Sequence, residues 1–225
     1  PITLHRALAK AARAGVTHAA MEASSHGLEQ RRLDGVQLVA AGFTNFSQDH
    51  LDYHETFDAY FDAKSALFDR VLPAEGVAVI NIDTPHGIDM ADVAMQAGQE
   101  LLAVGKAREA DLRLLAQRFD ATGQEIRMAY GGRIHQMKLA LIGGFQAENA
   151  MLAAGLAIAS GCDLLEHVRT QLPYALTVGV VAIGFGTIPA GYGLSPWVSM
   201  LVGMGLLVGI LQFAGRSADR IAEAA

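Results

Sequence analysis

The apolar positions of the chain follow two alternating patterns, one with helical spacing and one made of short continuous runs. Helical spacing occurs over residues 1–14, 56–72, 89–98, 148–160 and 163–172. Continuous runs, which favour buried strands, occupy residues 16–21, 38–43, 77–81 and 101–104. Strands and helices that alternate along a chain are typical of a parallel sheet covered by helices. The pattern therefore predicts an α/β fold with a mostly parallel, Rossmann-like sheet and flanking helices.

Residues 112–141 break this alternation. Three looser strands are expected at 112–119, 124–130 and 133–141, separated by Ala121-Thr122-Gly123 and Gly131-Gly132. Short glycine-containing links of this kind are typical of hairpin turns. We therefore predict a small antiparallel addition to the sheet.

The last quarter of the chain has a different composition. Residues 174–215 contain no Asp, Glu, Lys or Arg. The apolar run 197–215 approaches the ~20 residues that cross a bilayer, and Trp197 and Arg216 flank it as interfacial residues do. We predict a domain over 1–173 and an apolar tail over 174–225 with two transmembrane helices, which would attach residues 174–215 to the inner membrane. A buried hairpin in a soluble protein is the alternative.

Charge and cysteine content narrow the class of protein. The net charge of −6 argues against nucleic acid as a partner. The single cysteine, Cys162, excludes an internal disulfide and suits a reducing compartment such as the cytoplasm. Residues 1–15 have the pattern of an amphipathic helix, and we expect no signal peptide there.

Two polar clusters follow the first two expected strands. Glu22, Ser24 and His26 come after the first run, and residues 44–54, which include His50, come after the second. Parallel sheets bind ligands at the carboxyl ends of their strands, and Mg²⁺ accepts a few protein ligands beside water and phosphate. Glu22 and His50 are thus candidate metal ligands. In the alternative, Glu22 caps a helix and His50 satisfies a turn.

These clusters belong to an ordered set of motifs. The set consists of Glu22–Leu28, Gln30 with Arg32, Thr44-Asn45, Asp49-His50-Leu51-Asp52-Tyr53-His54 and Ala59-Tyr60-Phe61-Asp62-Ala63-Lys64. It resembles the central domain of the Mur ligases from residue 1 to about residue 173, and most closely the branch that adds the third amino acid of the peptidoglycan stem peptide. The resemblance implies an ATP-dependent C–N ligase. Its substrates would be UDP-N-acetylmuramoyl-L-alanyl-D-glutamate and a diamino acid, coupled through an acyl phosphate. The segment from Ser24 to Leu28 favours meso-diaminopimelate over lysine.

The resemblance also implies individual roles. Glu22 and His50 would contact Mg²⁺, with His26 and His54 supporting them. Ser24, Gln30 and Arg32 would contact the UDP-N-acetylmuramoyl-dipeptide. Asn149 would lie beside the adenine of ATP, and Lys64 would be carbamylated and catalytic. The alternatives are a solvated helix face for Gln30 and Arg32, a polar helix start for Asn149 and a solvated lysine for Lys64.

Parts of the family's pattern are not matched. No G-x-x-x-x-G-K-[ST] loop occurs, because the family's glycine loop precedes the position that aligns with Pro1. The family's Pro-Gly-Arg segment and C-terminal domain would follow residue 173. We therefore expect this chain alone to be inactive. Two other classes stay open: a membrane protein whose residues 1–173 are a non-catalytic ligase-derived segment, and a nucleotide-binding module that binds a UDP-sugar without catalysis.

Overall fold

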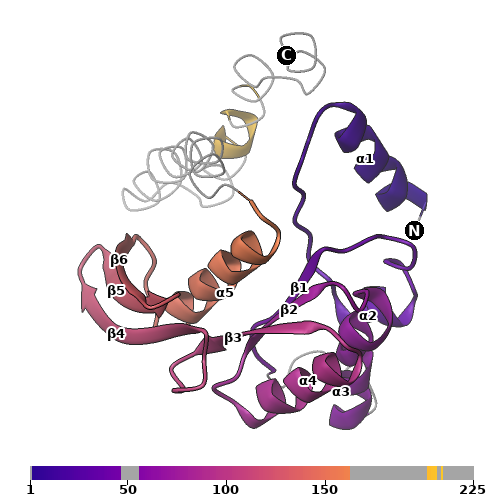
Figure 1. Ribbon diagram of the computed structural model, residues 1–225. Coiled ribbons are helices and arrows are strands. Elements are labelled where there is room, and N and C mark those ends of the chain that lie inside the picture. The colour runs from indigo at the N-terminus through magenta and orange to yellow at the C-terminus, as the bar shows by residue number, and fades with distance from the viewer. Residues whose placement is uncertain (1, 47–55, 163–201, 207–208, 210–225) are drawn as a thin grey trace. The chain divides into compact units, whose positions relative to one another are not determined.

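The computed structural model describes residues 2–46, 56–162, 202–206 and 209. These fall into two compact units, one made of residues 2–5, 20–46 and 56–162, and one containing residues 6–19, 202–206 and 209. The first unit contains the sheet and all the described candidate residues (Figure 1).

A six-stranded sheet has its strands in chain order, β1-β2-β3-β4-β5-β6. The strands are β1 (Ala40–Phe43), β2 (Val77–Asn81), β3 (Glu100–Gly105), β4 (Leu112–Asp120), β5 (Gly123–Tyr130) and β6 (Arg133–Leu139). Neighbours from β1 to β4 pair in parallel, and β4, β5 and β6 pair antiparallel. The predicted parallel sheet with an antiparallel addition is confirmed.

Both links of the antiparallel part are two-residue turns. Asp120 pairs with Gly123, and Tyr130 pairs with Arg133. Gly131 and Gly132 have φ values of 55° and 74°. Positive φ at both central residues is the requirement of a type I′ turn, which glycine meets without strain. The hairpin turn predicted at Gly131-Gly132 is confirmed.

The helices are α1 (Ile2–Arg13), α2 (Ser25–Glu29), α3 (Phe57–Ala66), the π-helix η1 (Leu67–Val71), α4 (Pro85–Gln96) and α5 (Phe145–Ala159). Helix α1 is followed by Gly15 at a φ of 80°, as its sequence predicts. The Thr56 hydroxyl accepts a hydrogen bond from the Ala59 N–H at 3.1 Å and so caps the start of α3.

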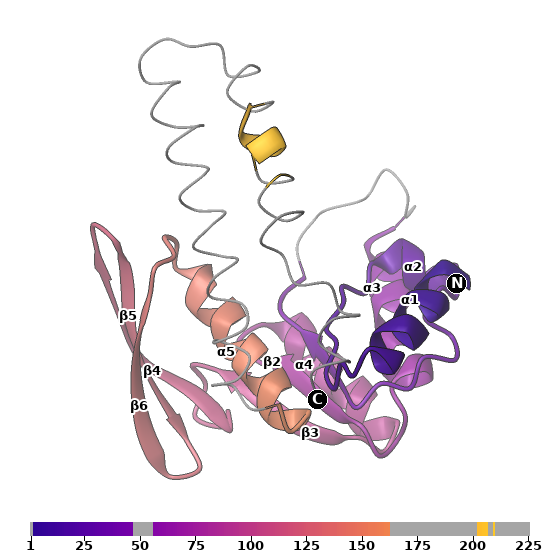
Figure 2. The same cartoon turned by 90° about the horizontal axis from the view of Figure 1, so that it is seen from above.

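Helices cover both faces of the parallel strands (Figures 1 and 2). Ala78 and Ile80 of β2 face one core, which also contains Phe68 of η1 and Met90 of α4. Val79, between them, faces a second core under α5. Because both faces of β2 are buried, the strand is apolar at every position from Val77 to Ile80, and the expectation that it is not an exposed edge is confirmed.

Several predicted elements differ in the structure. Residues 16–21 are exposed and form no strand, because an apolar run becomes a strand only where a neighbour pairs with it, and no described strand does. The predicted helix 56–72 is an α-helix followed by a π-helix. The predicted helices 89–98 and 148–160 begin earlier, at Pro85 and Phe145. In the first case the Thr84 cap and Pro85 at the helix start were overlooked.

Most of the predicted tail lies outside the described residues, as do the expected helix 163–172 and the domain boundary at 173. The described part of the tail, residues 202–206 and 209, is helical. Within the described ranges, no helix is both long and apolar enough to cross a membrane.

Candidate active site

The carboxyl ends of β1, β2 and β3 lie at one edge of the sheet. Parallel pairing sets Phe43 beside Ile80 and Asn81 beside Val104. The segments that follow are Thr44-Asn45-Phe46, Ile82-Asp83-Thr84 and Lys106-Ala107. The ligand-binding edge of an open α/β sheet is this carboxyl edge, so these segments frame the candidate site.

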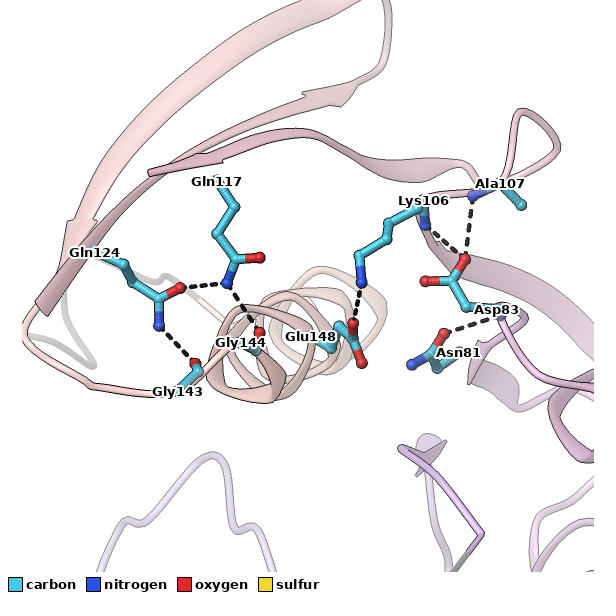
Figure 3. A network of polar contacts seen from close by, with 9 residues as sticks. All are labelled: Asn81, Asp83, Lys106, Ala107, Gln117, Gln124, Gly143, Gly144 and Glu148. Carbon is cyan, nitrogen blue, oxygen red and sulfur yellow. Dashed lines mark hydrogen bonds and ion pairs between the residues drawn. The ribbon is translucent and has the colours of Figure 1, made fainter. Parts of the chain in front are cut away.

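Asp83 links the segment that follows β2 to the segment that follows β3 (Figure 3). Its Oδ1 accepts hydrogen bonds from the backbone N–H groups of Lys106 at 2.7 Å and Ala107 at 3.1 Å. The Asp83 N–H donates to Asn81 Oδ1 at 3.1 Å. Gly105 has a φ of 154°, and a Cβ there would lie 2.5 Å from Asp83 Oδ1. The carboxylate and the glycine therefore fit each other and fix the turn after β3.

Lys106 extends the network to α5. Its Nζ lies 2.5 Å from Glu148 Oε1, in the first turn of the helix. This hydrogen bond raises the pKa of Lys106 above its usual 10.5, with partial burial opposing the shift. The ion pair holds the start of α5 to the end of β3.

The predicted substrate residues gather around α2. Ser24 is the N-cap of that helix, and its Oγ accepts from the Gly27 N–H at 3.2 Å. Arg32 donates from Nε at 3.0 Å and from Nη2 at 2.6 Å to Gln30 Oε1. Arg70 of η1 donates to Leu28 O at 2.6 Å, which ties this segment to the core. Ser24, Gln30 and Arg32 are exposed on one short segment, so the structure brings the three together.

The predicted metal ligands are only partly described. Glu22 lies in an exposed segment before α2, and its carboxylate is a hard oxygen donor that fits Mg²⁺. His50 and His54 lie outside the described residues. His26 is half-buried in α2. Among the described residues, no group of three His, Cys, Asp or Glu could hold a metal ion, so the Glu22–His50 pair stays a prediction.

Lys64 is half-buried on α3, with Nζ 5.1 Å from the centre of the Tyr60 ring. Tyr60 is buried, and its ring stacks on Phe46 at 4.8 Å. Phe46 also contacts His86 of α4 at 4.9 Å between ring centres. This aromatic cluster joins the end of β1 to the starts of α3 and α4, so His86 packs as a structural residue.

Asn149 is half-buried in the first turns of α5. Its Nδ2 donates to Gln146 Oε1 at a long 3.5 Å. It follows Glu148, the partner of Lys106, so the ion pair lies beside the predicted adenine position.

Sequence reasoning missed the polar network of Asp83, Lys106 and Glu148. Two signals were available: Asp83 and Lys106 each follow an apolar strand, as Glu22 and His50 were expected to do.

Comparison with known proteins gives consistent matches. The profile of the family described as Mur ligase middle domain matches residues 1–157. A UDP-N-acetylmuramoyl-L-alanyl-D-glutamate--2,6-diaminopimelate ligase of Caulobacter vibrioides is 50% identical over 156 residues, which are 69% of this chain and 32% of that protein. A ligase of the same name from a Chelativorans species is 47% identical over 175 residues, 75% of this chain and 36% of that protein.

A solved structure of a UDP-N-acetylmuramoyl-L-alanyl-D-glutamate--2,6-diaminopimelate ligase has the same fold. It superimposes with a TM-score of 0.66 at 36% identity, over 72% of this chain and 33% of that one. The chain spans about a third of the length of the curated relatives it matches.

Proposed function

Because the chain belongs to the Mur ligase middle-domain family, we propose that it is the central part of an ATP-dependent ligase of peptidoglycan synthesis. The ligase adds meso-diaminopimelate to UDP-N-acetylmuramoyl-L-alanyl-D-glutamate. The observation that carries this proposal is the 50% identity to a ligase of that name. The family match over residues 1–157 includes α2, α3, the network at Asp83 and the start of α5. We place the reaction in the cytoplasm, where ATP is available.

The reaction has two steps. The γ-phosphoryl group of ATP passes to the substrate carboxylate and ADP leaves. The amine of the diamino acid then attacks the acyl carbon, and phosphate and a proton are released as the amide forms. The protein's task in such a reaction is to hold the reactants in line and to stabilise the charge on the transferring group. Bound Mg²⁺ would supply part of that charge stabilisation, with Glu22 and His50 as its protein ligands.

The segment around α2 binds the UDP-N-acetylmuramoyl-dipeptide in this proposal. The Arg32 guanidinium suits anionic oxygens because its donors form a planar fork. Gln30 orients that guanidinium through its two hydrogen bonds. Ser24 accepts from Gly27, and its hydroxyl hydrogen can be donated to the substrate.

Lys64 acts as a carbamate. Its neutral amine attacks CO₂, an N–C bond forms and a proton is released, which leaves an anionic carbamate that would help to hold Mg²⁺. Nζ of Lys64 lies 5.1 Å from the centre of the Tyr60 ring. His26 and His54 support Glu22 and His50, and Asn149 contacts the adenine.

A second candidate concerns the tail. Residues 174–215 carry no Asp, Glu, Lys or Arg, and this composition supports attachment to the inner membrane. The ligase domain would then work close to the membrane surface.

The proposed function is tested with a hybrid ligase, in which residues 1–157 replace the similar segment of the Caulobacter vibrioides relative. The hybrid gene should restore growth to Caulobacter vibrioides cells depleted of their own ligase, and an empty vector should not. Lysis of cells that contain a folded, expressed hybrid would overturn the proposal.

A further inference from the structure

The loop between β6 and α5, residues 140–144, is not held by burial of its own side chains. Leu141 is 45% exposed and Ile142 77% exposed, and Phe145, the first residue of α5, is 57% exposed. Gly144 is the N-cap of α5, so no side chain caps the helix. Something other than apolar packing therefore fixes the backbone that leads to Asn149.

Two glutamine amides hold this backbone (Figure 3). Gln124 of β5 is 1% exposed, and its Nε2 donates to Leu141 O at 3.0 Å and Gly143 O at 3.1 Å. Its Oε1 accepts from Gln117 Nε2 of β4 at 2.5 Å. Gln117 Nε2 also donates to Gly144 O at 2.9 Å. Both amide hydrogens and the oxygen of Gln124 are thus used, and the carbonyls of Leu141, Gly143 and Gly144 are tied to the hairpin.

The hairpin is a rigid support for this contact. Gln124 pairs with Phe119 in β4 and with Leu139 in β6, so ladders on both sides hold its backbone. Loss of the hydrogen bonds of a buried amide lowers stability more than loss of those of an exposed amide, because water cannot replace the missing partners. The position of the loop is therefore set by the hairpin. The ion pair between Lys106 and Glu148 is a further contact, which attaches the first turn of α5 to the end of β3.

We propose that Gln124, together with Gln117, is a positioning residue that sets the segment from Gly143 to Asn149 for the adenine of ATP. The inference rests on the proposed function, in which Asn149 contacts the adenine. Gln124 touches no substrate and acts through the loop. Its loss should weaken ATP binding and leave the chemical step and the binding of the UDP-linked substrate unchanged.

The test uses Gln124→Met in the hybrid ligase, which keeps the side-chain length and removes the hydrogen bonds. The KM for ATP should rise about tenfold with kcat nearly unchanged, as expected when buried carbonyls lose their donors and only binding is affected. Gln117→Met should raise the KM for ATP only about threefold, because Gln117 is half-buried. The control is Gln136→Met on β6, whose amide donates to Glu125 Oε1 on the exposed side of the sheet.

A second measurement, on the full chain, is independent of activity. Hydrogen exchange at the amides of residues 142–148 should become faster in both variants and stay unchanged in Gln136→Met. If Gln124→Met does not fold, the Gln117 variant decides the question. An equal rise in the KM for ATP and in the KM for the UDP-linked substrate would overturn the inference. An unchanged KM for ATP in folded variants would also overturn it.

Asn149→Ala separates the inference from the proposed function. A raised KM for ATP in Asn149→Ala, with wild-type values in both glutamine variants, overturns the inference alone. An unchanged KM in Asn149→Ala overturns the role of Asn149 and the inference with it.

Discussion

The fit between Gly105 and Asp83 predicts a strong energetic coupling between these two residues. In Gly105→Ala the new Cβ would lie 2.5 Å from Asp83 Oδ1 and 2.8 Å from Cγ. Real contacts are not that short, so the carboxylate must move and lose its bonds to the N–H groups of Lys106 and Ala107. Asp83→Ala loses the same two bonds by another route.

The magnitudes follow from these contacts. Two charge-assisted bonds at an exposed turn contribute about 1.5 kcal/mol together, because water can replace them in part. Gly105→Ala adds about 1.5 kcal/mol of backbone strain at a positive φ. We therefore expect the free energy of unfolding to fall by about 3 kcal/mol in Gly105→Ala and by about 1.5 kcal/mol in Asp83→Ala. In the double variant it should also fall by only about 3 kcal/mol, because both changes remove the same two bonds. The difference from additivity is a coupling energy of about 1.5 kcal/mol.

The assay is urea unfolding of the full chain and its variants, followed by far-ultraviolet circular dichroism. Asp120→Ala is the matched control, since Asp120 Oδ1 also accepts two bonds, from Thr122 N and Oγ1 at 2.7 Å, within the β4–β5 turn. The effects of Asp120→Ala and Gly105→Ala on the free energy of unfolding should be additive in the double variant. If the Asp83 and Gly105 changes are additive too, the account of this turn is wrong.

Three further predictions concern Lys106, Lys64 and the tail. Lys106→Met should lower the free energy of unfolding by about 0.5 kcal/mol, a small value because the Lys106 side chain is 56% exposed. The pKa of Lys106 is raised, so this contribution is complete below pH 10.5 and lost as the pH rises through the higher folded-state pKa; urea midpoints across pH measure it. In the hybrid ligase, Lys64→Ala should lose ligation and regain part of it with acetate, whereas Lys64→Arg should be inactive and not rescued; wild-type rates in Lys64→Arg would show a solvated lysine. The full chain should partition into membranes and a chain ending at Leu172 should not, and a full chain that is monomeric without detergent would contradict the membrane tail.

The sheet was predictable because its signals are local. The apolar run of β2 reflects burial on both faces, and Gly131-Gly132 specifies its turn by backbone conformation alone. The run 16–21 has the same composition as a strand, but whether a strand forms depends on a pairing partner that composition does not reveal. Local signals therefore identified most elements and failed where a distant partner decides.

The candidate site was predictable only in part. Ser24, Gln30 and Arg32 are close in sequence, so their grouping around α2 follows from the chain itself. The bonds from Asp83 to Lys106 and from Lys106 to Glu148 join residues 23 and 42 positions apart, and Gln124 reaches Gly143 across 19 positions. Such pairs depend on strand order and register, which a single sequence does not specify.

The most direct test of the central claim is the reaction of the purified hybrid ligase. Supplied with ATP, Mg²⁺, UDP-N-acetylmuramoyl-L-alanyl-D-glutamate and meso-diaminopimelate, it should form the UDP-linked tripeptide with one ADP released per amide bond, and omission of the amino acid should abolish the product. A folded hybrid that binds ATP and forms no tripeptide would contradict the assignment of residues 1–157 as the central domain of this ligase.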